Sequence, residues 1–330
     1  MMHKFLFWFQ FKILKINHLV DYFGSLRIVY YHLVSDIRRD YYFNSSIGVD
    51  NFKRQIEFLK GRYEIISLSE ALVRAKNGDS LKNCLCLTFD DGFSDCYFQI
   101  YPILKRMRIS GTFFLIENTV NNRDLMWRNK LLLLDKEINE DSKRAILYRT
   151  VSEFGVENLE NGASSLFKAS STWSMSMKEE VVNFIWSIAD LPSLDDYLEK
   201  HKPYLDDDQI FEMLNNNMEF GNHTKSHPFC SQLSEEEIWH EIIATNQRMS
   251  SKFGTIFNSL SYPFGDRVSK DIEKYIRDNS TLEILLGIKD EFNNYNNPFS
   301  WERVCLEKPY YMSLNTYYLK VLLRKCNLLD

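Results

Sequence analysis

The 330-residue chain lacks the features that would place it at once in several classes of protein. It has no block of like charges and no low-complexity tract. It also has no excess of basic residues, because 40 Lys and Arg stand against 45 Asp and Glu and give a net charge of −5. Nucleic-acid-binding proteins usually carry a basic face, so we expect no nucleic-acid partner.

Cysteine pairs at the C-x-x-C spacing are also missing. The six cysteines are Cys84, Cys86, Cys96, Cys230, Cys305 and Cys326. Cys84 and Cys86 occupy alternate positions of one predicted strand and therefore point to the same face. We interpret the cysteines as small, buried apolar residues in a reduced compartment rather than as a disulfide framework.

No hydrophobic run is long enough to cross a membrane. The longest run in the apolar N-terminal segment is Phe5 to Phe9, which is too short for a signal h-region or a transmembrane helix. We predict an amphipathic segment over residues 1–24. It either packs on the domain, which we favour, or makes peripheral membrane contact through residues 1–20. With no export signal, we expect a cytoplasmic protein, membrane-associated under the second alternative.

The sequence does contain enough apolar material for a large core, with 45% hydrophobic and 15% aromatic residues. Strand-like segments alternate along the chain with helical ones. The strand-like segments are 26–32, 63–68, 84–89, 111–117, 218–223, 259–264, 282–288 and 303–307. This alternation predicts an α/β barrel or a related parallel sheet.

The alternation stops between about residues 121 and 205, where the pattern is helical and polar. A stretch of this length is too long for a structureless loop in a compact domain. We therefore predict a helical insertion over residues 121–205 in a barrel formed by residues 25–120 and 206–330. A final helix is expected from about residue 313 to 328.

Chemically capable residues follow four of the predicted strands, and catalytic residues of such barrels lie at the carboxyl ends of strands. They are His32, the pair Asp90 and Asp91, the histidines His223 and His227, and the turn Pro263–Phe264–Gly265. The purely structural alternatives are an acidic turn for the aspartates, surface loop residues for the histidines and an ordinary turn for the proline segment.

The spacing of the two histidines fits a metal site. His223 and His227 are four residues apart, which on a helical turn places both imidazoles on one face. With one carboxylate they would form a three-ligand site with open positions, suited to zinc and also to iron, cobalt or nickel. Because adjacent aspartate side chains diverge, one can bind the metal while the other takes a proton from water.

Three motifs together carry a family resemblance. "LTFDDG", "GNHTKSHP" and "LSYPFG" resemble, in order and spacing, the motifs of the polysaccharide deacetylases, also called carbohydrate esterase family 4 or NodB-type enzymes. The resemblance covers residues 25–120 and 205–308. It implies a distorted (β/α) barrel that uses a divalent metal to remove N-acetyl, and sometimes O-acetyl, groups from sugars.

The resemblance implies a role for each matched residue. Asp90 matches the general base. Asp91, His223 and His227 match the ligands of the metal, for which we expect Zn²⁺, with Co²⁺, Ni²⁺ or Fe²⁺ as alternatives.

Two further motif positions are matched. Thr224 corresponds to the small hydroxyl residue after the first histidine and is expected to order the loop. After Pro263, the backbone N–H of Phe264 corresponds to the donor that binds the oxyanion, and such a donor contributes about 3 kcal/mol.

Two positions depart from the family pattern. The third motif usually begins with an arginine that holds the base, but Ser261 stands there, and Arg267 or Arg303 would have to replace it. The C-terminal leucine-x-histidine motif that supplies the general acid is missing, because no histidine follows His240. His32 resembles the N-terminal histidine of a circularly shifted subgroup and suits protonation of a leaving amine. The alternative is a strand-end histidine bonded to the backbone.

The remaining aromatic residues and an acidic run have ordinary structural interpretations as well as functional ones. Tyr31, like Tyr30 and Trp127, is a candidate for stacking on a sugar, although buried core aromatics are commoner. The acidic run 206–208 is interpreted as the N-terminal cap of a helix rather than as a metal site.

The sequence therefore predicts a metal-dependent hydrolase that removes acetyl from an N-acetylated sugar of a glycan or lipid-linked saccharide and releases acetate. Two alternatives remain. One is an O-acetyl esterase. The other, motivated by the missing arginine and acid motif, is a catalytically inactive module of the same fold that binds glycan or serves in assembly. The sequence does not indicate an oligomeric state.

Overall fold

The computed structural model describes residues 26–39, 41, 46–137, 140–155, 170, 173–289, 293 and 300–307. The amphipathic segment predicted over residues 1–24 and the final helix expected from about 313 to 328 lie outside these residues. Within the described ranges, none of the helices combines the length and the apolar character that crossing a bilayer requires.

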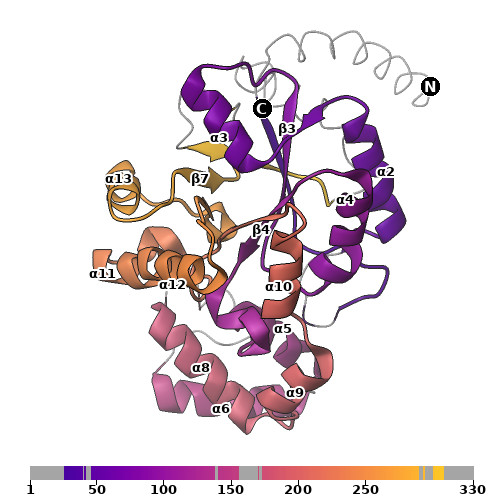
Figure 1. Cartoon of the computed structure of the whole chain (residues 1–330). Coiled ribbons are helices and arrows are strands. Elements are labelled where there is room, and N and C mark those ends of the chain that lie inside the picture. Colours follow the sequence, from indigo (N-terminus) through magenta and orange to yellow (C-terminus); the bar gives the residue numbers. More distant parts are fainter. Residues whose placement is uncertain are drawn as a thin grey trace, which may run out of the picture.

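Nine parallel strands in the described residues form one sheet at the centre of the molecule (Figure 1). The strands are β1 (Arg27–Tyr31), β2 (Glu64–Ile65), β3 (Cys84–Phe89), β4 (Thr112–Leu115), β5 (Glu219–Asn222), β6 (Ser259–Ser261), β7 (Ile284–Gly287), β8 (Trp301–Glu302) and β9 (Val304–Cys305). Their order in the sheet is β8-β7-β6-β5-β4-β3-β1-β9. The short strand β2 is not part of this order and pairs with β3. Each of the eight predicted strand segments contains an observed strand.

The two ends of the sheet meet at Arg303. Strand β8 pairs with β7 at one end of the order, and β9 pairs with β1 at the other. Because Arg303 alone separates β8 from β9, the chain steps there from one end of the sheet to the other. This step closes the sheet into a distorted (β/α) barrel, which confirms the predicted fold.

Strand β3 lies between β1 and β4 in the sheet, and all six of its residues are buried. Such a continuous apolar run is typical of a parallel strand covered on both faces. Leu85 and Leu87 pack in one apolar cluster, whereas Cys84 and Cys86 pack together in another, as alternation predicts. The five described cysteines are free; four are buried and Cys305 is partly exposed.

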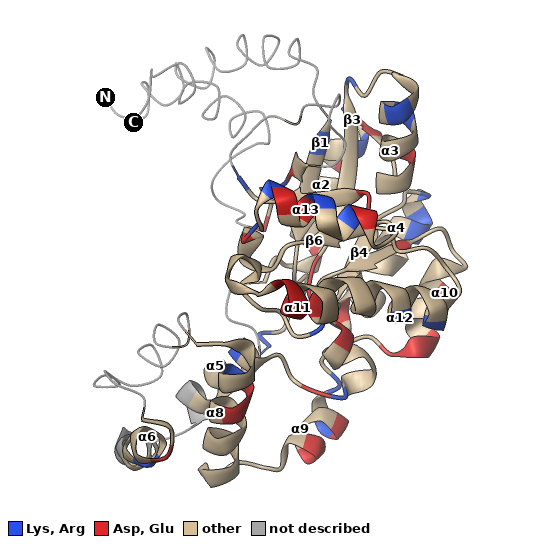
Figure 2. Ribbon diagram, turned by 90° about the vertical axis from the view of Figure 1, so that its left-hand side faces the viewer, with Lys and Arg blue, Asp and Glu red and all other residues tan. Residues whose placement is uncertain are grey.

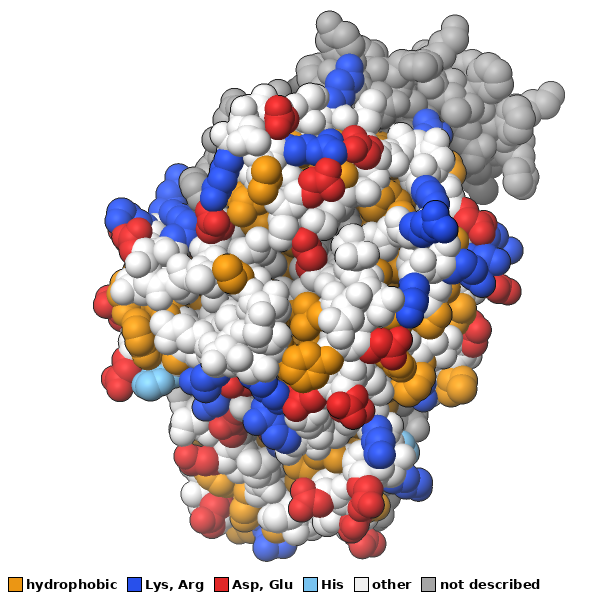
Figure 3. Space-filling view, viewed as in Figure 1, with side chains coloured by type: hydrophobic (Ala, Val, Ile, Leu, Met, Phe, Trp, Pro, Cys, Tyr) orange, Lys and Arg blue, Asp and Glu red, His pale blue; other side chains and the backbone are white. Residues whose placement is uncertain are grey.

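Helices surround the barrel. They are α2 (Val49–Lys60), α3 (Leu68–Asn77), η1 (Cys96–Ile100), α4 (Tyr101–Met107), η2 (Glu117–Asn122), α10 (Asp207–Leu214), η3 (Cys230–Gln232), α11 (Glu235–Ile238), η4 (Trp239–Ile243), α12 (Ala244–Phe253), η5 (Pro263–Gly265) and α13 (Lys270–Asp278). Asp206 caps α10 in a capping box with Gln209, which confirms the interpretation of the acidic run. Acidic and basic residues both occur along the outer helices (Figure 2), and their side chains are interspersed on the face shown in Figure 3.

Between η2 and α10, the described chain carries α5 (Trp127–Glu137), α6 (Glu140–Phe154), α8 (Met175–Ile188) and α9 (Leu194–His201). These helices lie together at one end of the barrel (Figures 1 and 2). Their apolar side chains share a single cluster with Leu33, Phe93 and Ile116, which follow β1, β3 and β4. The helices therefore pack on the loops at the carboxyl ends of the strands. That residues 121–205 form a separate insertion stays a prediction.

Candidate active site

A cleft of about 170 Å³ opens at the carboxyl ends of the barrel strands. Its lining includes most of the predicted site residues, namely His32, Asp90, Asp91, His223, His227, Phe264 and Arg303. Residues that are up to 271 positions apart in the chain, His32 and Arg303, thus meet in one place because parallel strands bring their carboxyl ends to one end of the barrel.

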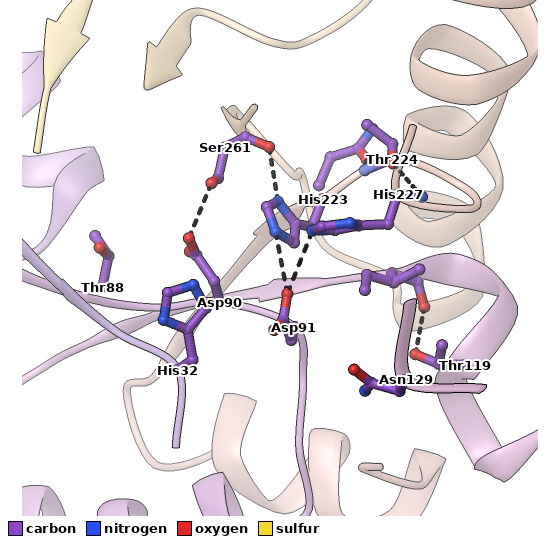
Figure 4. Close-up of polar contacts among 12 residues, drawn as sticks. His32, Thr88, Asp90, Asp91, Thr119, Asn129, His223, Thr224, His227 and Ser261 are labelled. Atoms are coloured by element: carbon purple, nitrogen blue, oxygen red, sulfur yellow. Dashed lines mark hydrogen bonds and ion pairs between the residues drawn. The ribbon is translucent and has the colours of Figure 1, made fainter. Parts of the chain in front are cut away.

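Asp91, His223 and His227 form a compact cluster. The distance from Asp91 Oδ1 to His223 Nε2 is 3.3 Å, and that from Asp91 Oδ1 to His227 Nε2 is 3.6 Å (Figure 4). One ligand atom from each residue lies within 4.8 Å of the others, and all three residues are buried. The cluster matches the ligand set that the sequence predicts.

The chemistry of these donors fits a cation. His223 Nδ1 lies 2.7 Å from the carbonyl oxygen of Ser261, so Nδ1 carries the proton and Nε2 offers a lone pair. Asp91 Oδ1 faces this lone pair and is buried without a hydrogen bond. Burial and the neighbouring His223 lower the pKa of His227 to about 3, so this imidazole is neutral. Two lone pairs and a carboxylate oxygen buried together are satisfied by a divalent metal.

The backbone around the cleft is strained. Asp91, Thr224, His227 and Phe264 have φ angles of 71°, 68°, 64° and 59°, in the left-handed region that non-glycine residues rarely adopt. Each such residue costs on the order of 1–3 kcal/mol and persists only where its surroundings hold it. Of the ten described non-glycine residues with a positive φ, these four line or adjoin the cleft, so the packing around the cleft must hold them in this conformation.

Side chains hold the histidine loop in this conformation. Thr224 Oγ1 accepts a hydrogen bond from the His227 backbone N–H at 3.0 Å, which is the ordering contact expected of this residue. Asn222 Oδ1 accepts from the Thr224 N–H at 2.7 Å, and Asn222 Nδ2 donates to the Ile242 carbonyl at 2.9 Å. The loop is therefore tied to both the end of β5 and the turn η4.

Glu241 is a site residue that the sequence did not reveal. It lies in the π-helical turn η4, and its carboxylate accepts from the N–H of Ser226 at 2.9 Å, the N–H of Lys225 at 3.1 Å and the Ser226 hydroxyl at 2.7 Å. The carboxylate thus holds the two residues directly before His227. No sequence signal marks it, because the π turn that presents it is not visible in the hydrophobic pattern.

Arg303 holds Asp90 in place of the missing motif arginine. Its Nη1 and Nη2 contact Asp90 Oδ1 and Oδ2 at 2.7 and 2.8 Å, and Nη2 also donates to Ser261 Oγ at 2.6 Å. Burial acts to raise the pKa of Asp90, but Arg303, together with His223 and His32, outweighs burial and lowers that pKa, which keeps the carboxyl ionised. Arg267, the other candidate, instead pairs with Glu273 and Glu302.

His32 is coupled to Glu307, a second residue that sequence reasoning missed. His32 Nδ1 lies 3.0 Å from Glu307 Oε2, and Glu307 Oε1 accepts from the N–H groups of His32 and Leu33. Burial acts to lower the pKa of His32, but the Glu307 carboxylate, with smaller contributions from Asp91 and Asp90, raises it to about 9. Glu307 ends the last predicted strand segment, so the search of strand ends that selected His32 would also have found it.

The turn after β6 leaves the Phe264 N–H outside its own backbone hydrogen bonds. Pro263 is buried and begins η5, whose two backbone hydrogen bonds are donated by Gly265 to Tyr262 and by Asp266 to Pro263, both at 2.9 Å. The Phe264 N–H takes no part in these two bonds, and Phe264 lines the cleft.

Tyr31 does not reach the cleft. It is fully buried, donates from its hydroxyl to Gln55 Oε1 at 3.0 Å and stacks on Phe89 in the core. Strand alternation turns its neighbour Tyr30 toward the cleft instead, where the Arg303 guanidinium lies 4.8 Å from the Tyr30 ring centroid. Contact between Tyr31 and substrate therefore does not fit this position.

A family model described as polysaccharide deacetylase matches residues 77–157 and 171–281, more than half of the chain. Among curated relatives, poly-beta-1,6-N-acetyl-D-glucosamine N-deacetylase of Staphylococcus aureus is 31% identical over 129 residues, which are 38% of this chain and 44% of the relative. The Staphylococcus epidermidis protein of that name is 26% identical over 54% of this chain and 61% of its own. The chain thus spans less than two thirds of these relatives.

Solved structures show the same fold. Streptococcus pyogenes deacetylase PplD in complex with acetate superimposes with a TM-score of 0.57 at 17% identity, over 90% of this chain and 97% of its own. IcaB from Ammonifex degensii superimposes with a TM-score of 0.57 at 14% identity, over 91% and 96%. At these identities the likeness concerns the fold.

Replacing Arg303 by methionine should destabilise the protein. The variant leaves the buried Asp90 carboxylate without its partner, so we expect the free energy of unfolding to fall by about 3–5 kcal/mol. Arg74→Met is the control, because Arg74 pairs with the exposed Glu64 and Glu70, and its loss should cost under about 1 kcal/mol. Urea unfolding at neutral pH measures both, and equal losses would contradict the role of Arg303.

Glu241→Gln should weaken metal binding. The amide can accept fewer hydrogen bonds than the carboxylate, so the loop that carries His227 is held less firmly. We expect the Kd for Co²⁺, followed by its visible absorption, to rise about 10- to 100-fold. Glu236→Gln, an exposed position on α11, should leave the Kd unchanged. Equal Kd values for both variants would show that Glu241 does not position the ligand.

Proposed function

Because the chain belongs to the polysaccharide deacetylase family, we propose that it is a metal-dependent hydrolase that removes the acetyl group from an N-acetylated sugar of a glycan or lipid-linked saccharide. The observation that carries this proposal is the content of one cleft. A three-ligand metal cluster, the ionised carboxyl of Asp90 and the imidazole of His32 with its raised pKa all line it. These are the groups that hydrolysis of an amide requires.

Asp91, His223 and His227 are proposed to hold the metal, and we propose Zn²⁺, with Co²⁺, Ni²⁺ and Fe²⁺ as alternatives. When bound there, the ion would lower the pKa of a water molecule and polarise the acetyl carbonyl. The ligand count is typical of catalytic sites, since three protein ligands leave coordination positions open.

Asp90 is proposed as the general base. A carboxylate oxygen of Asp90 accepts the proton of the water that attacks the carbonyl carbon. Arg303 and Ser261 orient this carboxylate, because Arg303 contacts both of its oxygens and the Ser261 hydroxyl donates to Oδ2 at 3.3 Å. As negative charge develops on the acetyl oxygen, the Phe264 backbone N–H donates a hydrogen bond to it.

His32 is proposed as the general acid, in the circularly shifted arrangement. Since Nδ1 is engaged by Glu307, Nε2 is the nitrogen that would give its proton to the leaving amine. The C–N bond breaks, the amine nitrogen takes this proton, and acetate and the free amino sugar leave.

The hypothesis of an inactive binding module loses part of its support. It arose from the absent motif arginine and the absent C-terminal acid, and the contacts of Arg303 and of the pair His32 and Glu307 offer a replacement for each. The O-acetyl esterase alternative is tested by comparing turnover of ester and amide substrates.

Asp90→Asn should abolish most of the turnover. We expect acetate release from oligomers of β-1,6-linked N-acetylglucosamine, the sugar in the name of the staphylococcal relatives, to fall about 10²- to 10⁴-fold because the amide cannot accept the proton. Metal content should stay at the wild-type level. Asp206→Asn, which alters only the cap of α10, serves as the control. Undiminished turnover of Asp90→Asn with normal metal content would contradict the assignment of Asp90 as the general base.

The pH profile should depend on Glu307. The acid form of His32 is the active one, so a pKa raised to about 9 keeps it protonated through neutral pH, and kcat/KM should fall only above about pH 9. Glu307→Gln removes the raising charge, so this alkaline limb should move toward the ordinary imidazole value of about 6.5. An alkaline limb that stays in place in Glu307→Gln would exclude His32 as the acid.

A further inference from the structure

A cluster of three aromatic rings, Trp127, Phe229 and Phe264, joins the helices between η2 and α10 to the cleft. Phe229 stacks on Phe264 with 4.4 Å between centroids and an interplanar angle of 18°, and Trp127 lies 6.3 Å from Phe264. The ring of His227 meets Phe264 edge to face at 4.6 Å. This ring cluster therefore touches both the proposed oxyanion donor and a metal ligand.

Lys178 of α8 places its ammonium group on this ring cluster. Its Nζ lies 5.0 Å from the Phe229 centroid and 5.4 Å from the Trp127 centroid, within the range of a cation–π interaction. The residue is only 1% exposed. Burial lowers the pKa of Lys178 to about 8, while Asp266 acts to raise it, so the group is mostly charged at neutral pH.

A buried ammonium group held in this way is costly. In the part of the chain that the structure describes, no hydrogen bond or ion pair joins the Lys178 ammonium, so the two rings and the more distant charge of Asp266 are what favour its charged form there. Lys130, on α5, shows the usual solution: it is also buried, but its Nζ donates to Asn183 at 2.9 Å and pairs with Asp124 at 2.6 Å. Packing alone does not explain Lys178, because methionine would fill similar space without this cost.

Two routes lead from Lys178 to strained residues of the cleft. Lys178 contacts the Phe229 ring, which stacks on the Phe264 ring, and the φ of Phe264 is 59°. Through Trp127 it reaches His227, whose φ is 64°, because Trp127 Nε1 donates to the His227 carbonyl at 3.0 Å. Strained backbone of this kind needs neighbours that hold it.

We propose that Lys178 is a positioning residue for the reaction, holding the ring cluster so that Phe264 and His227 keep the backbone conformations the cleft requires. The catalytic part of this inference rests on the proposed function. It also assigns a role to the helices between η2 and α10: α5 and α8 support the cleft wall rather than only covering it.

The test compares Lys178→Met with Lys130→Met in the full-length, metal-loaded protein. We expect Lys178→Met to lower kcat about tenfold or more, since small displacements of reacting groups are costly, with KM nearly unchanged and a melting temperature equal to or above that of the wild type. Lys130→Met should show the reverse, a lower melting temperature with kcat nearly unchanged. Lys178→Arg keeps the cation and should recover part of kcat.

The outcomes separate the two proposals. Wild-type kcat in Lys178→Met overturns the inference while the proposed function stands, and so does a loss of kcat that only follows a loss of melting temperature. If the wild type itself releases no acetate, the proposed function fails. Crystal structures of the wild type and Lys178→Met then decide the inference: a shifted ring cluster with a relaxed Phe264 backbone supports it, and an unmoved cluster overturns it.

Discussion

The buried ion pair between Arg303 and Asp90 ties the closure of the barrel to its chemistry. Arg303 stands at the step from β8 to β9, where the two ends of the sheet meet, and its guanidinium reaches Asp90, Ser261 and Thr88. One side chain thus joins the closing segment to β6 and to β3. Removing two charges from water is expensive, and the cost is offset here because Arg303 contacts both carboxylate oxygens and two hydroxyls. The closure of the barrel therefore places the partner of Asp90 in the cleft.

Carboxylates outside the ligand set govern the rest of the cleft. Glu241 holds the loop before His227, and Glu307 holds His32 by its ring and by its backbone. Each carboxylate is buried and forms its hydrogen bonds with neighbouring residues of the protein. The ring cluster supplies an apolar counterpart through Lys178. Orientation by such supporting residues is what allows a few side chains in strained conformations to meet at fixed distances.

The parts of the site that the sequence predicts are those with a local signal. Asp90 and Asp91 follow a buried strand, and His223 and His227 have the four-residue spacing of a ligand pair, so their convergence follows from the strand-end rule for parallel barrels. The contacts of Glu307 with His32 span 275 residues. Periodicity carries no information about such a pairing. The prediction for Tyr31 is wrong for a local reason: neighbouring residues of a strand point to opposite faces, so Tyr31 lies in the core while the residue before it lines the cleft.

The sequence by itself determined the alternation of strands and helices, the strand ends that carry chemistry and the ligand types, because these depend on neighbours within a few residues. Only the tertiary structure decided which arginine holds Asp90. Arg267 and Arg303 are both arginines that could fill the role by sequence, but the barrel closes at Arg303, and Arg267 is paired with Glu273 and Glu302. It also decided that Lys178 faces aromatic rings while Lys130 faces a carboxylate, since helix packing rather than composition selects the partner of a buried charge.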